Sequence, residues 1–340
     1  MNNSLTDVAG FLVGHAAVAG PNALSGTTVV LAPPGGAVAA VEVRGGGPGT
    51  RETDALDPKN VVERIDAVVL TGGSAYGLDA AAGVMAWLEE RQRGVRVGPE
   101  PHQVVPVVPA ACLFDLGRGG DWRARPDAAV GRAAVEAAGT EVTEGNVGAG
   151  TGAVVGGLKG GVGTASVTLA SGVTVAALAV VNAVGSPVDP HNGALYGEYG
   201  EDSPAQLPTP ERHLGAQARL AAARVEMPPL NTTLAVVATD ARLTRPQAQK
   251  LAGTSHDGLA RAVRPVHLMH DGDTIFALAT GSHDSGPDGT DKALSPEELN
   301  HILAAGADVV ARAIVRGVRA AGSVEGPGGT FPSYGDLYGS

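Results

Sequence analysis

Short apolar runs, rich in β-branched residues and bounded by glycine or proline, predict the strands of this chain. Seven such runs stand out: residues 27–31, 37–43, 67–70, 162–169, 173–181, 233–238 and 274–279. The runs 173–181 and 233–238 are apolar almost throughout, which is typical of strands buried on both faces. We therefore expect these two strands inside sheets rather than at exposed edges.

Helical spacing of apolar residues is clearest in residues 78–92. Four further helices are predicted at residues 127–138, 211–223, 246–262 and 296–320. Asp127 is a plausible N-cap, and Ser295 with Pro296 and Glu298 has the form of a capping box with proline in the first turn. Strands and helices together predict a globular α/β protein.

Glycine and proline divide the chain. Glycines are concentrated in residues 43–49 and in residues 145–163, which contain nine of them. Seven prolines fall between residues 187 and 229. We interpret this segment as an exposed connection and as the main internal boundary ahead of a new strand.

Composition narrows the class of protein. The 340 residues include 35 acidic and 24 basic side chains, a formal net charge of −11 with no basic block, which argues against a nucleic-acid partner. Only 3% of residues are aromatic, so the core must be built from Ala, Val and Leu. Cys112 is the single cysteine, which excludes an intramolecular disulfide framework and a cysteine-rich zinc site. No secretory signal is visible and the longest apolar run, 173–181, is too short to cross a bilayer, so we expect a soluble, cytoplasmic protein with no membrane partner.

Two nucleotide-binding patterns fail. Residues 148–153 fit G-x-G-x-x-A, but the next acid after Glu144 is Asp189, too late to hold a ribose. Lys159 is followed by Gly160 where a phosphate loop needs Ser or Thr. No cofactor is expected.

Residues 72–77, G-G-S-A-Y-G, resemble a nucleophile elbow around Ser74. Tyr76 stands where that motif needs its second glycine, so we favour a turn whose small residues let a strand and a helix approach closely.

A metal site and a surface turn are both compatible with the segment from His267 to Asp273. Imidazole and carboxylate ligands at His267, His270, Asp271 and Asp273 would suit several divalent ions. On a strand, however, Asp271 and Asp273 share one face while His270 points to the other. The two carboxylates on one face are the more useful observation, and we assign no metal ion.

Thr232 lies at the head of an apolar strand, directly after the proline-rich connection. Its hydroxyl could attack the carbonyl of Asn231, giving an ester that water resolves. The new N-terminal threonine would carry its own base, because an α-amine titrates near 7.7 to 8.0. Thr233 is the competitor, but neighbouring residues on a strand face opposite ways, so only one can address the site.

Five segments carry a resemblance in this order: T-G-G-S-A-Y-G-L-D-A-A-A-G-V at 71–84, G-N-V-G-A-G-T-G-A at 145–153, A-V-V-N-A-V-G at 179–185, N-T-T-L-A-V-V-A-T at 231–239 and H-D-G-D-T-I-F-A at 270–277. Through them the chain resembles the self-processing aminopeptidases and amidases that include the L-aminopeptidase/D-esterase, the β-peptidyl aminopeptidases and the nylon-oligomer endo-hydrolase. The resemblance implies a single αββα layered domain of the N-terminal-nucleophile type, made as one precursor and cut into residues 1–231 and 232–340. It also implies a homotetramer.

The same resemblance implies roles for individual residues. The cut bond would be Asn231–Thr232 and Thr232 the nucleophile, a threonine that favours the nylon-oligomer type over the serine branches. Lys159 and Asn182 match the family's lysine and oxyanion-side asparagine. Asp271 and Asp273 match acids near the nucleophile. A tyrosine of the nylon-oligomer branch falls at Phe114, and residues 115–122 offer no evident substitute.

The leading function is hydrolysis of a small linear amide or peptide through a threonine acyl-enzyme. Candidate substrates are amino-terminal residues of peptides, β-amino amides and 6-aminohexanoate oligomers. One alternative is acyl transfer of the ornithine acetyltransferase type, in which an amine replaces water as acceptor. A non-enzymatic, glycine-rich scaffold is the alternative from a different class.

Overall fold

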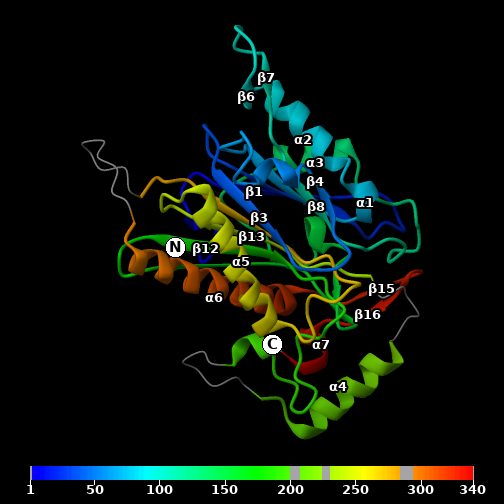
Figure 1. The fold of residues 1–340 in the computed structure, drawn as a ribbon. Helices are drawn as coiled ribbons and strands as arrows, with labels where there is room; N and C mark the ends of the chain where they lie inside the picture. The colour runs from blue at the N-terminus through cyan, green and yellow to red at the C-terminus, as the bar shows by residue number, and fades with distance from the viewer. Residues whose placement is uncertain (1, 200–206, 224–229, 284–293, 340) are drawn as a thin grey trace.

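Two five-stranded sheets lie face to face in the middle of the molecule, and helices cover the outer face of each (Figure 1). This computed structural model describes residues 2–199, 207–223, 230–283 and 294–339. The layers are therefore helix, sheet, sheet, helix, and the predicted αββα architecture is confirmed.

The first sheet has the order β1-β2-β5-β8-β4. Its parallel pair is β5–β8, and the other neighbours are antiparallel. Two helices, α2 (Ala80–Glu89) and α3 (Ala128–Glu136), cover its outer face (Figure 1). The strands are β1 (Leu12–Ala17), β2 (Gly26–Leu31), β4 (Gly49–Arg51), β5 (Ala67–Thr71) and β8 (Ala110–Cys112).

The second sheet has the order β11-β12-β13-β14-β3. Its parallel pair is β13–β14, joined by α5 (Arg245–Ala262), which covers the outer face together with α6 (Pro296–Ala320). Every residue of β12, β13 and β14 is buried, so the expectation that 173–181 and 233–238 lie inside a sheet is confirmed. The strands are β3 (Val38–Val43), β11 (Val162–Thr168), β12 (Thr174–Val180), β13 (Leu234–Thr239) and β14 (Thr274–Ala279).

Alternating side chains along β13 divide the core between two layers. Leu234 and Val236 face the first sheet and pack with Val68 and Leu70 of β5. Ala235 and Val237 face the other way and belong to the cluster that contains α5 and α6. Because a strand points successive side chains to opposite faces, continuous apolarity here serves two cores at once.

The predicted helices are present with small changes of boundary. The helix predicted at 78–92 is α2, which a short α1 (Ser74–Gly77) precedes, and the helix predicted at 211–223 is α4 (Pro210–Ala222). Asp127 accepts from the N–H of Val130, and Ser295 forms its capping box with Glu298. A Cβ on Gly77 would collide with the carbonyl of Gly72, so the turn around Ser74 is closely packed, as favoured above.

Short elements complete the described chain. They are the 3-10 helices Leu5–Asp7, Thr53–Leu56, Gly148–Gly150 and Tyr196–Glu198, the pairs β6 (Val95–Arg96) with β7 (Val104–Val105), β9 (Val154–Val155) with β10 (Leu158–Lys159) and β15 (Val324–Gly326) with β16 (Gly329–Phe331), and α7 (Tyr334–Tyr338). Among the described residues, no helix combines the length and hydropathy of a membrane span.

The proline-rich connection is less exposed than expected. In its described parts, Ala194, Leu195 and Ala216 are buried. His213 on α4 bonds the carbonyl of Pro190 at 2.8 Å and the hydroxyl of Tyr338 at 3.1 Å. The expectation of an exposed connection is therefore wrong for these parts, because α4 packs on α7; residues 200–206 and 224–229 lie outside the described residues.

Candidate active site

The segment that enters β13 lies beside the loop that enters β14. The two strands are parallel, so their amino-terminal ends meet at one edge of the sheet, and Asn231 forms a bridge with Asp271. The N–H of Asn231 donates to the carbonyl of His270 at 3.2 Å. We call residues 267–273 the acidic loop.

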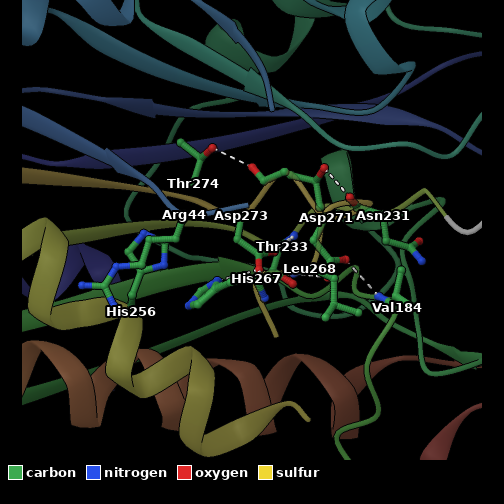
Figure 2. A network of polar contacts seen from close by, with 12 residues as sticks. Arg44, Val184, Asn231, Thr233, His256, His267, Leu268, Asp271, Asp273 and Thr274 are labelled. Atoms are coloured by element: carbon green, nitrogen blue, oxygen red, sulfur yellow. Dashed lines mark hydrogen bonds and ion pairs between the residues drawn. The ribbon is translucent and has the colours of Figure 1, made fainter. Parts of the chain in front are cut away.

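The carbonyl oxygen of Asn231 accepts two hydrogen bonds. The Thr232 hydroxyl donates to it at 2.6 Å and the backbone N–H of Gly272 donates at 3.2 Å (Figure 2 draws the bond from the loop). Thr232 is 4% exposed. A Cβ on residue 272 would lie 2.6 Å from the Thr232 hydroxyl oxygen, so the close approach requires glycine there.

Thr233 makes a different set of contacts. Its hydroxyl donates to the carbonyl of Asn182 at 3.1 Å, and its N–H donates to Asp273 at 3.0 Å. Of the two neighbouring threonines, Thr232 is therefore the one whose hydroxyl bonds the carbonyl of residue 231.

Both acids of the acidic loop are fully buried and held by N–H donors (Figure 2). Asp271 accepts from the backbone N–H groups of Val184 and Leu268, each at 3.2 Å. Burial raises the pKa of Asp271, and the charge of Asp273 raises it further. The sequence left a strand with both acids on one face and a surface turn as alternatives; the two acids lie buried in the loop before β14, where each carboxylate accepts hydrogen bonds from backbone N–H groups.

Asp273 bonds Thr233, next to β13, and His267, at the start of the acidic loop. One oxygen accepts from Thr233, and the other accepts the backbone N–H of His267 at 3.1 Å and contacts its ring Nδ1 at 2.8 Å. His267 has φ +59°, and in this conformation its backbone N–H and its ring Nδ1 both reach the same Asp273 oxygen. His256 packs edge-on against the His267 ring, with centroids 4.9 Å apart.

The metal-site alternative finds no support in these contacts. All four carboxylate oxygens of Asp271 and Asp273 already accept N–H donors, and His270 is exposed. The described residues contain no group of three His, Cys, Asp or Glu side chains that could hold a metal ion.

The glycines of residues 43–49 allow a second loop to pack on the acidic loop. Gly47 and Arg44 donate backbone N–H groups to the carbonyls of Asp271 and Asp273 at 2.8 and 3.0 Å. A Cβ on Gly45 would collide with the backbone of the acidic loop. Glycine is needed here for close approach.

On the side of Asn231 away from the acidic loop, Arg118 connects Gly152, Asn182 and Asn231. One terminal nitrogen donates to the side-chain oxygen of Asn182 at 2.6 Å and to the carbonyl of Gly152 at 2.7 Å. The other terminal nitrogen donates to the side-chain oxygen of Asn231 at 2.6 Å. Arg118 is 3% exposed, and these three acceptors hold its planar guanidinium group in place.

The Asn182 side chain has a defined orientation. Its oxygen accepts from Arg118 and from the backbone N–H of Val154 at 2.9 Å, so the remaining atom must be the NH₂ group. That nitrogen is buried and has no hydrogen-bond partner among the described residues. A buried donor without a hydrogen-bond partner lowers the stability of the fold, so its presence points to a functional role.

Lys159 is buried next to the same cluster. Its ammonium donates to the carbonyls of Gly150 and Gly160 at 2.8 and 2.6 Å. Burial lowers the pKa of Lys159 to about 7, and the charge of Arg118 contributes to this shift. Burial also raises the pKa of Asp115 to about 6, although its bond from the Gly73 N–H and the two cations oppose the shift.

The structure brings four of the predicted residues, Asn182, Asn231, Asp271 and Asp273, to the same site. Asn182 and Asp273 both contact Thr233, and Asp271 is bridged to Asn231. The ammonium of Lys159 bonds the carbonyls of Gly150 and Gly160 rather than Thr232. Phe114 is nearly buried and stacks edge-on with Trp122 at 6.2 Å, so its position offers no hydroxyl.

Sequence reasoning missed Arg118, Asp115 and the role of His267. Arg118 lies in residues 115–122, where only a tyrosine substitute was sought. A charged pair embedded among glycines directly after an apolar run, D-L-G-R-G-G, could have drawn attention to it.

A cavity of about 690 Å³ opens beside Asn231 and Arg118. Its wall includes Val184 after β12 and, farther out, Leu220 of α4 and Phe331 of β16. Asn231, whose carbonyl accepts the two hydrogen bonds, thus lines a space large enough for a small molecule.

The chain matches Peptidase family S58 over residues 3–331. It is 49% identical to an uncharacterized aminopeptidase of Mycobacterium bovis over 99% of this chain and 98% of the relative. The chain belongs to peptidase family S58. A 6-aminohexanoate-oligomer endohydrolase of Kocuria sp. (strain KY2) is 32% identical over 76% of this chain and 70% of that protein.

Solved structures agree with this S58 assignment. A Burkholderia sp. beta-aminopeptidase superposes with a TM-score of 0.72 and 25% identity, over 98% of this chain and 91% of that one. The L-aminopeptidase D-Ala-esterase/amidase of Ochrobactrum anthropi, described as a variant of the Ntn hydrolase fold, has the same TM-score at 24% identity, with 98% and 91% coverage, and shows the fold.

Membership of S58 makes the protein a hydrolase acting on amide bonds. The predicted family and reaction class are therefore confirmed. The comparisons give no support to the acyl-transferase alternative or to a non-enzymatic scaffold.

Proposed function

We propose that the chain cuts its own Asn231–Thr232 bond and that Thr232 then hydrolyses small amides or peptides. The observation that carries this proposal is the 2.6 Å hydrogen bond from the Thr232 hydroxyl to the Asn231 carbonyl. The same carbonyl accepts the Gly272 N–H, so the reacting group is already polarised.

Self-processing begins with attack of the Thr232 oxygen on the Asn231 carbonyl carbon. The C–N bond to Thr232 breaks, its nitrogen takes up a proton, and an ester links residues 231 and 232. Water then hydrolyses this ester, leaving chains 1–231 and 232–340. Lys159, with its pKa lowered to about 7, can exist as a neutral amine at neutral pH and so can accept a proton on the other side of the site.

Turnover repeats the chemistry on a substrate. The freed α-amine of Thr232 takes the hydroxyl proton, because an α-amine titrates near 7.7 to 8.0. The acyl carbonyl becomes an oxyanion that the unpaired NH₂ of Asn182 and backbone N–H groups stabilise. Asp271 and Asp273 hold the backbone around the nucleophile, and Lys159 sets the local charge.

The names of the relatives suggest the substrates. Aminopeptidases and 6-aminohexanoate-oligomer endohydrolases cleave amides of small linear acyl groups, and we propose a substrate of that size here. We also propose a homotetramer, which light scattering of the purified protein would test: a mass of one 340-residue equivalent would contradict it.

Substitution of Thr232 tests the proposal. Thr232→Ala should remain a single chain without amidase activity, because the attacking oxygen is lost in both reactions. Thr232→Ser should still be cut, because the hydroxyl is kept. Denaturing electrophoresis and release of a chromogenic amine measure the two outcomes, and an active, uncut Thr232→Ala protein would contradict the mechanism.

A further inference from the structure

The Asn231 side chain occupies the place of a substrate's acyl substituent. In self-processing, Asn231 supplies the acyl group that Thr232 attacks. In turnover the same hydroxyl attacks the carbonyl of a substrate, which must therefore lie where the Asn231 carbonyl lies in the uncut chain. Whatever the substrate carries beyond that carbonyl extends toward the contacts that the Asn231 side chain now makes.

Those contacts are with Arg118. The Arg118 nitrogen that bonds Asn231 lies 2.6 Å from the side-chain oxygen, while the other terminal nitrogen is held by Asn182 and Gly152. The fork is thus fixed from behind and presents one N–H group to the position of the acyl substituent. Burial lowers the pKa of Arg118 only to about 10, so the group stays cationic at neutral pH.

The cavity has the matching charge. Arg118 and Arg264 are its charged residues, and none of the described residues that line it is acidic. A substrate ammonium at the place of the Asn231 amide would face Arg118 without a carboxylate to balance it. An oxygen acceptor at the same place would gain a charge-assisted hydrogen bond.

We infer that Arg118 is a specificity-determining residue that selects acyl groups with a carboxamide or carboxylate at the fourth carbon, counted from the scissile carbonyl carbon, as in asparagine. The inference deepens the proposed function and rests on it. The reaction is hydrolysis throughout: the amine leaves with a proton, water resolves the ester, and no further co-reactant is needed.

A series of four p-nitroanilides tests the selection in the mature, wild-type enzyme. The acyl groups are succinamoyl, succinyl, butanoyl and β-alanyl, which place a carboxamide, a carboxylate, a methyl group and an ammonium at the same position. We expect kcat/KM for succinamoyl and succinyl to exceed that for butanoyl by about tenfold or more, as for a hydrogen bond to a charged group, with β-alanyl lowest. If β-alanyl is the best of the four, the inference is wrong.

Arg118→Gln tests the residue, with Arg123→Gln as matched control in the same loop. Arg123 is exposed and does not line the cavity. Arg118→Gln should bring the succinamoyl-to-butanoyl ratio close to one, whereas Arg123→Gln should keep the wild-type ratio. An unchanged ratio in Arg118→Gln would overturn the assignment.

Processing supplies a readout that needs no added substrate and applies if Arg118→Gln fails to mature. Asn231→Leu keeps the shape but removes the acceptor, and Asn231→Asp keeps an acceptor. We expect cleavage of Asn231→Leu to be about tenfold slower than wild type and Asn231→Asp to be affected less. Equal rates for Leu and Asn would contradict the inference.

The two failures can be told apart. A wild-type chain that stays whole and releases no nitroaniline refutes the proposed function and the inference together. A chain that is cut and prefers β-alanyl or butanoyl refutes the inference alone.

Discussion

The two sides of the Asn231–Thr232 bond satisfy their buried polar groups differently. On the acidic loop, all four oxygens of Asp271 and Asp273 accept N–H donors, mostly from backbone. On the opposite side, buried Arg118 and Asn182 each keep one nitrogen without a hydrogen-bond partner among the described residues.

This difference indicates that the acidic loop holds the backbone in place, whereas the Arg118–Asn182 side takes part in the reaction. A carboxylate whose oxygens are all bonded fixes the surrounding backbone and has little left to offer a substrate. An unpaired donor in a buried site is costly in the resting protein and gains a partner only when charge develops or a ligand arrives. We therefore expect changes on the Arg118–Asn182 side to alter rates, and changes on the acidic loop to alter stability.

Asn182→Ala should give the largest effect on rate. It removes the proposed oxyanion donor, so processing and kcat should each fall by about 10²–10³, the usual effect of losing one such donor. The melting temperature should change little, because Arg118 keeps its bond to the carbonyl of Gly152.

Asn300→Ala, at an exposed position of α6, is the matched control and should process normally. Wild-type rates in Asn182→Ala would remove Asn182 from the mechanism, and wild-type rates in Lys159→Ala as well would remove Lys159.

The pH dependence of processing tests Lys159. With its pKa lowered to about 7, Lys159 is protonated below that pH and cannot accept a proton. The processing rate of refolded precursor should rise about tenfold per pH unit below 7 and level off above it, as for a single base. Lys159→Met should be slow and lack this rise; the same profile in both proteins would contradict the role.

The same shift has a consequence for stability. The pKa of Lys159 is lower in the folded chain than in the unfolded chain, so between about pH 7 and 10 the unfolded chain binds a proton that the folded chain lacks. The free energy of unfolding contributed by this group therefore rises with pH across that window. Denaturant titrations of uncut Thr232→Ala, with and without Lys159→Met, would measure it; a contribution that falls with pH would contradict the shift.

His267 should give the smallest effect on rate. His267→Ala removes the ring contact to Asp273 but keeps the backbone donor, so it should cost about 1–3 kcal/mol of stability with less than a tenfold loss in processing rate. His267→Asn should recover most of the stability, because asparagine tolerates positive φ and carries an N–H at a similar distance.

His270→Ala, an exposed neighbour in the same loop, is the control for thermal unfolding. A loss of activity in His267→Ala without a loss of stability would mean that the acidic loop takes part in the chemistry and is more than a scaffold.

Periodicity predicted the regular elements well where packing agrees with local pattern. β14 and α6 match their predicted bounds, since β14 is apolar almost throughout and α6 is apolar along one face. β1 was missed because Gly14 and His15 interrupt its apolar run. Glycine is needed at position 14 because α3 packs against it: a Cβ would collide with the carbonyl of Ala134. No local pattern in the sequence shows this contact.

The site was predictable only in part for the same reason. Thr232, Asn182 and the two acids lie in segments that resemble a known family. Arg118 acquires its role from residues 34, 64 and 113 positions away, so its own neighbourhood carries little signal. For Asp271 and Asp273 the sequence left a strand and a surface turn open, because the contacts that bury both carboxylates come from residues distant in sequence, such as Val184 and Thr233.

The central claim is that Thr232 begins a new chain. Intact mass and N-terminal sequencing of the purified wild-type protein test it most directly. We expect two chains of residues 1–231 and 232–340, the second with threonine at its amino terminus followed by the sequence T-L-A-V-V. A single uncut chain in active protein, or a second chain that begins at Thr233, would contradict it.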